Sequence, residues 1–271
     1  MPIAQNLNGD IFRIYYSTRD SNNRSNGAFI DIDILNPLEI INISEQPVLL
    51  PGDIGLFDDS GVSLSSFCNG RLFYLGWNLP KNVPFSNQIG SASLGDSGIN
   101  KNRSMPLLPK CEKEPFSFGY PWVMYHEGKY KMWYDVIVKW TRNSPDGYVS
   151  KLRLAESQDG INWDKTYIDC VSLQVEEKCI SRPCIIYENE IFKIWYSINS
   201  NGKYLIGYAE SLNGIDWQRK DQEVGIETSK FGWDSEEIEY PYVFDHKGDR
   251  YMLYNGNGYG RTGFGLAKLQ K

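Results

Sequence analysis

The sequence has little of what membrane insertion, zinc binding or secretion requires. It contains no run of about 18 apolar residues, so no transmembrane helix is expected. Only 2 His occur, and the 5 Cys form no Cys-X-X-Cys pair, which argues against a metal site. An odd number of cysteines without that spacing is typical of free thiols in a reducing compartment. The first residues lack a basic stretch followed by an apolar one, so we expect no secretory signal and a cytoplasmic location.

Basic residues are fewer than acidic ones, 28 against 34, which gives a formal net charge of −6. This balance argues against nucleic acid or an anionic membrane surface as the main partner. Hydrophobic residues make up 41 % of the 271 positions and charged residues 23 %, as in ordinary globular proteins. We expect no cofactor and no metal ion, and the oligomeric state stays open.

Aromatic residues and glycine are abundant. The chain has 18 Tyr, 8 Trp and 25 Gly, which favours strands and turns. No long amphipathic helical pattern is present, and this argues against an α/β fold.

One hairpin pattern occurs repeatedly. It consists of an apolar strand led by proline, a polar turn and an alternating strand, and it is clearest at 120–135, 182–197 and 240–255. Two weaker copies precede these, at 1–17 and 62–77. A β-sandwich would not repeat the same hairpin sequence, so the repetition favours another all-β architecture.

A second repeated element follows two of these hairpins. Residues 155–163 and 209–217 share the pattern Ala-X-Ser-X-Asp/Asn-Gly-X-X-Trp, in which Asp-Gly and Asn-Gly mark tight turns. A unit of about 50 residues with three or four antiparallel strands is typical of a propeller blade. We therefore predict a single domain over residues 1–271, a five-bladed β-propeller with three- to four-stranded antiparallel blades. The proline-led strands would line the central channel, with each proline at a strand start.

With these features the sequence resembles the five-bladed β-propeller glycosidase superfamily, over essentially the whole chain. That group includes arabinanases and xylosidases, invertases and levansucrases, and mannoside phosphorylases. The resemblance implies a carbohydrate substrate and two carboxylates near the starts of inner strands, one a general acid and the other a nucleophile or base. Cleaving a glycosidic bond passes through an oxocarbenium-like state, which needs both groups.

Four acids are candidates for the catalytic groups that the resemblance implies. Asp59 lies at the approach to the second unit, although the family's Asp-Pro pair is absent, and Glu239 lies two residues before Pro241 as in the invertase-like Glu-Cys-Pro element. We expect Asp59 to be the base or nucleophile and Glu239 the general acid. Glu177 and Asp135 are reserves. The alternatives are an Asx-turn for Asp59, an exposed charge run for Glu239 and surface charges for the two reserves.

The candidates for substrate binding are polar and aromatic side chains near the same ends of the units. Aromatic rings pack on the apolar faces of sugar rings, while planar polar side chains bind hydroxyls. An arginine directly before Pro183 would bind a carboxylate or phosphate, or keep a neighbouring acid ionised. For Arg19 and Asp20, a structural ion pair is an equal alternative. The full set is Arg19, Asp20, Trp77, Tyr120, Trp122, Arg182, Trp233, Asp234, Glu236 and Asn255.

The function that the sequence favours is cleavage of a glycosidic bond in an oligosaccharide or glycoconjugate. Two other functions stay open. A phosphorolytic or transfer enzyme on the same scaffold would need clustered cations, for which Arg19, Arg182 and Arg261 are the candidates. A glycan-binding propeller without catalysis would fit the third unit, whose entry at 116–120 carries no carboxylate.

Overall fold

The computed structural model describes residues 1–95, 98–141 and 147–270. They form strands joined by turns, with two short helical elements, η1 (Asp221–Glu223) and α1 (Asn257–Gly260). The strands are β1 (Ile3–Asn8), β2 (Ile11–Arg19), β3 (Ser25–Asp33), β4 (Ile40–Ile43), β5 (Gly61–Cys68), β6 (Arg71–Asn78), β7 (Ser86–Gly95), β8 (Gly98–Lys101), β9 (Phe118–His126), β10 (Lys129–Trp140), β11 (Tyr148–Ser157), β12 (Asp164–Asp169), β13 (Glu177–Glu188), β14 (Ile191–Ser200), β15 (Lys203–Ser211), β16 (Gln218–Arg219), β17 (Glu239–His246), β18 (Asp249–Asn255) and β19 (Phe264–Lys268). No helix in these ranges is long and apolar enough to cross a membrane.

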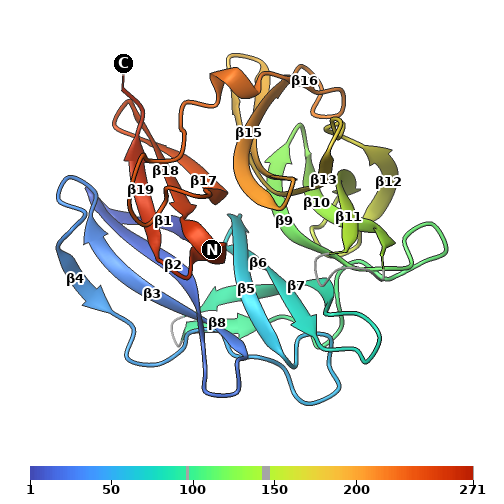
Figure 1. Cartoon of the computed structure of the whole chain (residues 1–271). Coiled ribbons are helices and arrows are strands. Elements are labelled where there is room, and N and C mark those ends of the chain that lie inside the picture. The colour runs from blue at the N-terminus through green and yellow to red at the C-terminus, as the bar shows by residue number, and fades with distance from the viewer. Residues whose placement is uncertain (96–97, 142–146, 271) are drawn as a thin grey trace.

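Antiparallel pairing divides the strands into five groups in chain order, β1–β4, β5–β8, β9–β12, β13–β16 and β17–β19. The pairing confirms the hairpins expected from the repeats. In Figure 1 the groups follow one another around the molecule from blue to red, and the last lies beside the first. This all-β arrangement is consistent with a propeller.

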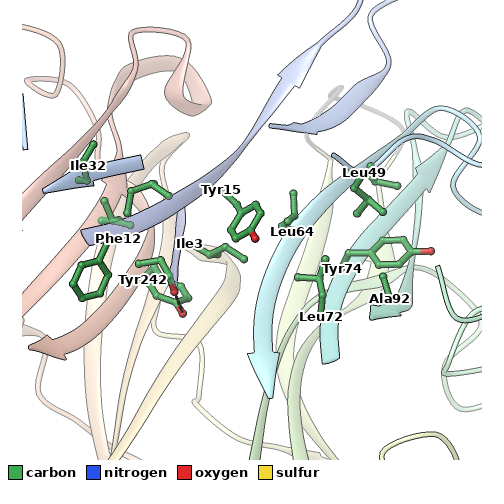
Figure 2. Packing of buried hydrophobic residues seen from close by; sticks show 14 of the residues in the cluster. Ile3, Phe12, Tyr15, Ile32, Leu49, Leu64, Leu72, Tyr74, Ala92 and Tyr242 are labelled. Atoms are coloured by element: carbon green, nitrogen blue, oxygen red, sulfur yellow. Dashed lines mark hydrogen bonds between the residues drawn. The ribbon is translucent and has the colours of Figure 1, made fainter. Parts of the chain in front are cut away.

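Hydrogen bonds and buried side chains join the last group to the first. The Tyr242 hydroxyl donates to the carbonyl oxygen of Ala4 at 3.0 Å. The Asp10 carboxylate accepts from Lys247 Nζ at 2.8 Å and lies 2.7 Å from His246 Nε2. Figure 2 shows Tyr242 beside Ile3 in a buried cluster that extends to the second group. Burial of these apolar side chains holds the last strand group against the first.

The repeated Gly-containing turn docks each of two groups on the group before it. The carbonyl oxygen of Gly214 accepts from Trp133 Nε1 of the third group at 2.8 Å. In the same way, the carbonyl oxygen of Gly160 accepts from Arg71 of the second group. The motif therefore forms contacts between groups as well as closing a local turn.

The inner-strand prolines depart from the prediction. Pro121, Pro183 and Pro241 lie inside β9, β13 and β17 and not at strand starts. The residue before each proline has a positive φ, which is 47° at Tyr120, 52° at Arg182 and 57° at Tyr240. The pairing register shifts at each of these points. Such a bulge leaves the proline outside the regular ladder, so its missing N–H removes no sheet hydrogen bond.

Two glycines allow a test of the docked turn. Gly214 and Gly202 both have positive φ, at 74° and 81°. A Cβ at Gly214 would lie 2.9 Å from Trp133 Cζ2, whereas nothing lies within 4 Å of one at Gly202. We expect Gly202→Ala to lower the free energy of unfolding by about 1 kcal/mol, because the backbone strain is its only cost. Gly214→Ala should lower it by about 1–3 kcal/mol more through overpacking. Urea denaturation measures both, and equal losses would contradict docking on Trp133.

Candidate functional site

A cavity of about 430 Å³ lies at one end of the five strand groups, and every group contributes to its lining. Its volume is within the usual range for a small-molecule site. Aromatic side chains are prominent among the described residues that line it. These are Trp77, Phe85, Tyr120, Tyr148, Tyr204, Tyr240 and Tyr259.

One position of the repeated hairpin delivers polar side chains to this cavity. In the second, alternating strand of the hairpin, this position follows a tyrosine near the strand end. It is Ser17 in β2, Asp135 in β10 and Asn255 in β18. The equivalent Ser197 in β14 accepts the backbone N–H of Tyr240 at 2.8 Å. Asp135 and Asn255 were predicted as site residues. Ser17 was missed, although its place in the repeat signals it.

Asp135 is the one carboxylate among the described lining residues. Its side chain is 5 % exposed, and its Oδ1 atom has no hydrogen-bond partner among them. The residue opposite it on β9 is Gly119, where a Cβ would lie 3.5 Å from Asp135 Oδ1. Burial raises the pKa of Asp135 to about 7. The group therefore changes charge near neutral pH.

Glu239 is 0 % exposed and is not among the residues that line the cavity, although its chain neighbour Tyr240 is. It faces Asn255 across β17 and β18, and neither of its carboxyl oxygens makes a well-aligned hydrogen bond in the described chain, although the Tyr240 hydroxyl and the Met1 amino group both act to lower its pKa. Burial, followed by the negative charge of Glu237, raises the pKa of Glu239 well above its ordinary value. The raised pKa favours the protonated form of the carboxyl group, which is the form that a general acid needs.

A pair of tyrosines connects the two acids. The rings of Tyr120 and Tyr240 both line the cavity, and their centroids are 5.6 Å apart. After burial, the negative charges of Asp135 and Glu239 also raise the pKa of Tyr120, so both acids lie near this phenol. Burial raises the pKa of both tyrosines, so that their hydroxyls are neutral donors.

Arg182 is buried next to the same tyrosines. Its side chain is 1 % exposed, and Nη1 donates to the carbonyl oxygen of Ser65 at 3.0 Å. Its Nε and Nη2 atoms have no partner within the described protein. Unpartnered buried atoms also occur on Ser17, Ser65, Asp135 and Glu239. Buried polar groups without partners are rare, and most of those in the described chain belong to these five residues, which makes the cavity the candidate site.

Asp59 and Glu177 do not line the cavity, so the structure does not bring the predicted pair Asp59 and Glu239 together there. The Asp59 carboxylate accepts from Gly55 N at 3.0 Å and from Ser60 Oγ at 2.9 Å, as expected for the alternative of a loop cap. Glu177 forms a two-pronged ion pair with Arg219, at 2.7 and 2.8 Å. Both carboxylates are satisfied by structural partners.

Some of the predicted substrate-binding residues lie at the cavity, and the others have structural contacts elsewhere. Arg19, Trp77, Tyr120 and Asn255 line the cavity, and Arg182 is buried behind it. The other five lie outside the lining and have structural contacts. Asp20 pairs with Arg24, Trp122 packs on Tyr242, Trp233 stacks on Tyr254, Asp234 accepts from the Tyr254 hydroxyl, and Glu236 is exposed with its N–H donated to Asn257.

Tyr148, Tyr204, Tyr240 and Phe85 were not predicted as site residues. Tyr240 precedes Pro241 just as Tyr120 precedes Pro121, so the repeat could have identified it. The other three come from strands and loops without a repeated signal. No group of three His, Cys, Asp or Glu side chains suited to a metal ion occurs in the part of the chain that the structure describes.

Two mycobacterial proteins are similar to the whole chain. It is 40 % identical over 279 residues to the uncharacterized protein MT1551 of Mycobacterium tuberculosis (strain CDC 1551 / Oshkosh), covering 100 % of this chain and 92 % of that protein. The uncharacterized protein Rv1502 of strain ATCC 25618 / H37Rv is 39 % identical with the same coverage. No family model matches the sequence.

Several solved structures share the fold. A glycoside hydrolase superposes with a TM-score of 0.76 at 16 % identity, covering 100 % of this chain and 87 % of that one. A thermostable family-43 glycoside hydrolase gives 0.73 at 14 % identity, with 100 % and 89 % covered. The endo-arabinase of Bacteroides thetaiotaomicron VPI-5482 gives 0.68 at 12 % identity, with 100 % and 93 % covered. At these identities the likeness concerns the fold.

The raised pKa of Asp135 predicts how stability changes with pH. The folded protein keeps this proton up to about pH 7, whereas the unfolded chain releases it near 3.8. The unfolded state therefore binds fewer protons between these values, and stability falls as the pH rises through this window. Asp135→Asn should remove about 4 kcal/mol of that fall in the free energy of unfolding. Urea denaturation between pH 4 and 8 measures it.

The matched control for this measurement is Glu227→Gln, since Glu227 is exposed. The free energy of unfolding of this variant should change with pH as that of the wild type does. A decline in Asp135→Asn as steep as in the wild type would contradict a buried protonated carboxyl at position 135.

Proposed function

Since the chain belongs to the family of the mycobacterial proteins MT1551 and Rv1502 and has the fold of the propeller glycosidase superfamily, we propose that it is a glycoside hydrolase-like enzyme. Its substrate would be an oligosaccharide or glycoconjugate. Glu239 is the general acid, and Asp135 takes the role of base or nucleophile that the sequence assigned to Asp59. One observation carries this proposal. Asp135 lines the aromatic-lined cavity with its Oδ1 unpartnered within the described chain, and the charges of Asp135 and of the buried Glu239 both act on Tyr120 of the same cavity.

The two acids have the different protonation states that the chemistry needs. With a pKa of about 7, Asp135 ionises at neutral pH, while Glu239 stays protonated. Glu239 donates its proton to the leaving oxygen as the glycosidic bond breaks. Ionised Asp135 either attacks the anomeric carbon or removes a proton from the attacking water. In either role, the negative charge of Asp135 stabilises the positive charge that develops on the sugar ring.

The tyrosines and Asn255 position the sugar in this proposal. The Tyr120 and Tyr240 hydroxyls bind sugar hydroxyl groups between the two acids. The Asn255 amide is held by a 3.1 Å hydrogen bond from its Nδ2 to the carbonyl oxygen of Tyr259. Trp77 and Phe85 offer apolar faces to the sugar ring. Expulsion of water from such a site strengthens each polar contact.

The proposal includes a five-bladed propeller that forms one domain over residues 1–271. The five antiparallel groups would be its blades. The contribution of every group to one cavity supports this interpretation. A propeller active site at the axis requires each blade to present residues at the same end.

A glycan-binding propeller without catalysis is the second candidate. It is favoured by the residues before the inner prolines of the third and fourth groups, Tyr120 and Arg182, neither of which is a carboxylate. Phosphorolysis would require a cationic phosphate site. Arg19 lines the cavity and Arg182 is buried behind it, whereas Arg261 is not among the lining residues. Turnover measured with and without inorganic phosphate separates hydrolysis, phosphorolysis and binding alone.

Substitution of the acids tests the catalytic assignment. A panel of 4-nitrophenyl glycosides, with and without phosphate, identifies a substrate for the wild-type protein. Asp135→Asn and Glu239→Gln should each lower kcat on it by about 10²- to 10⁴-fold, because proton transfer is lost. Glu227→Gln, an exposed substitution, should leave kcat unchanged. If Asp59→Asn abolishes turnover and Asp135→Asn does not, the pair assigned from the sequence is right and this proposal is wrong.

The pH dependence of kcat gives an independent test. Asp135 must be ionised, so kcat should rise with pH around a midpoint near 7. It should fall again at higher pH, where Glu239 loses its proton. A rising limb centred near 3.8, the ordinary aspartate pKa, would contradict a role for buried Asp135.

A further inference from the structure

Arg19 is the only basic side chain among the described residues that line the cavity. It stands exposed at the end of β2. Its guanidinium carbon lies 5.4 Å from the centre of the Trp77 ring, and Nη1 donates to the carbonyl oxygen of Asn23 at 2.7 Å. Within the described ranges no carboxylate forms an ion pair with it. The guanidinium therefore stands on the cavity wall without a carboxylate in direct contact among the described residues.

Asp20, which follows Arg19 in the chain, forms its hydrogen bonds with other residues. Asp20 accepts from Arg24 Nε and from the backbone N–H groups of Asn22 and Arg24, each at 2.9 Å. These bonds close the loop after β2, and that loop presents the Asn23 carbonyl oxygen to Arg19. Trp77 is fixed as well, because its Nε1 donates to Ser25 Oγ at 2.7 Å. Both supports of the Arg19 side chain are held in place before any ligand binds.

A buried hydroxyl group without a hydrogen-bond partner lies on the same face of the strand as Arg19. Ser17 precedes Arg19 by two residues, so both side chains point to the same side of β2. Ser17 Oγ is buried without a partner among the described residues, and Ser17 also lines the cavity. The one lining carboxylate, Asp135, comes from β10 in the other large sheet. The cavity thus carries a cation from one sheet and an acid from another.

We propose that Arg19 binds an anionic substituent of the ligand, either the carboxylate of a uronic acid or a phosphate on a sugar. Ser17 would donate to the same sugar residue. A guanidinium matches carboxylate and phosphate oxygens with two parallel hydrogen bonds, and such charge-assisted bonds are stronger than bonds to neutral hydroxyls. The sugar nature of the ligand rests on the proposed function. The anionic group rests on Arg19 and its surroundings.

Binding of three matched probes tests the proposal. Methyl glucuronide, glucose 6-phosphate and methyl glucoside are titrated into the wild-type protein by calorimetry at low ionic strength. At least one anionic probe should bind about tenfold or more tightly than the neutral glucoside. Tighter binding of the glucuronide identifies a carboxylate, and tighter binding of glucose 6-phosphate identifies a phosphate. Equal affinity for all three probes, or binding of none, overturns the proposal.

Variants show whether the preference comes from this site. Arg19→Gln should remove the preference for the anionic probe over the neutral glucoside, while Arg19→Lys should keep part of that preference because the charge remains. Arg103→Gln makes the same charge change at an exposed residue outside the cavity and should keep the full preference. Equal loss in Arg103→Gln and Arg19→Gln overturns the proposal. Thermal denaturation of each variant confirms that it is folded.

The binding measurement can overturn the anionic ligand without affecting the catalytic assignment, and the turnover measurement can do the reverse. Equal affinity for the three probes in a protein whose turnover depends on Asp135 and Glu239 overturns the anionic ligand alone. An anion preference that depends on Arg19, in a protein whose turnover is unchanged by Asp135→Asn and Glu239→Gln, overturns the catalytic assignment alone.

Discussion

The left-handed backbone at the residue before each inner proline is the constraint on which the site depends. Tyr120, Arg182 and Tyr240 all have positive φ, and a residue that precedes proline normally adopts an extended conformation. Such strain costs about 1–3 kcal/mol per residue and persists only where the surrounding structure enforces it. Here it interrupts the strand pairing and places two tyrosines at the cavity and an arginine behind it. Without the bulges these side chains would follow the regular alternation of a strand.

The bulges also decide which residues lie opposite one another across the inner and middle strands. Gly119 faces Asp135 in the third group, and Glu239 faces Asn255 in the fifth. The carboxylate missing from the entry of the third inner strand is therefore supplied by the middle strand across the ladder. A glycine on the inner strand leaves room for it. The two groups present the same pair of positions with the acid on opposite strands, which places both acids at one end of the molecule.

Buried acids without partners reduce stability, and the apolar clusters elsewhere offset this cost. Isolated charges are expensive to bury, so Asp135 and Glu239 favour their neutral forms, as their raised pKa values show. Asp10, Asp20 and Glu177 instead have cationic partners near the surface. Among the described residues the chain thus separates structural ion pairs from two acids without an ion-pair partner, Asp135, which lines the cavity, and Glu239, which is buried next to the lining residue Tyr240. This separation is the physical basis for assigning chemistry to that end of the fold.

Local patterns in the sequence determined the all-β class and the five hairpins, and they offered four candidate acids, of which Asp135 lines the cavity. Alternation and turn residues act over a few positions, so these features could be predicted without tertiary contacts. The tertiary structure decided which acids face the cavity. Asp59 is satisfied within its own loop, whereas Glu177 is bound by Arg219, 42 residues further along the chain. It also placed the prolines inside strands and brought Arg19 beside Trp77. Burial and charge balance depend on neighbours from other strand groups, and for that reason the sequence order alone does not contain them.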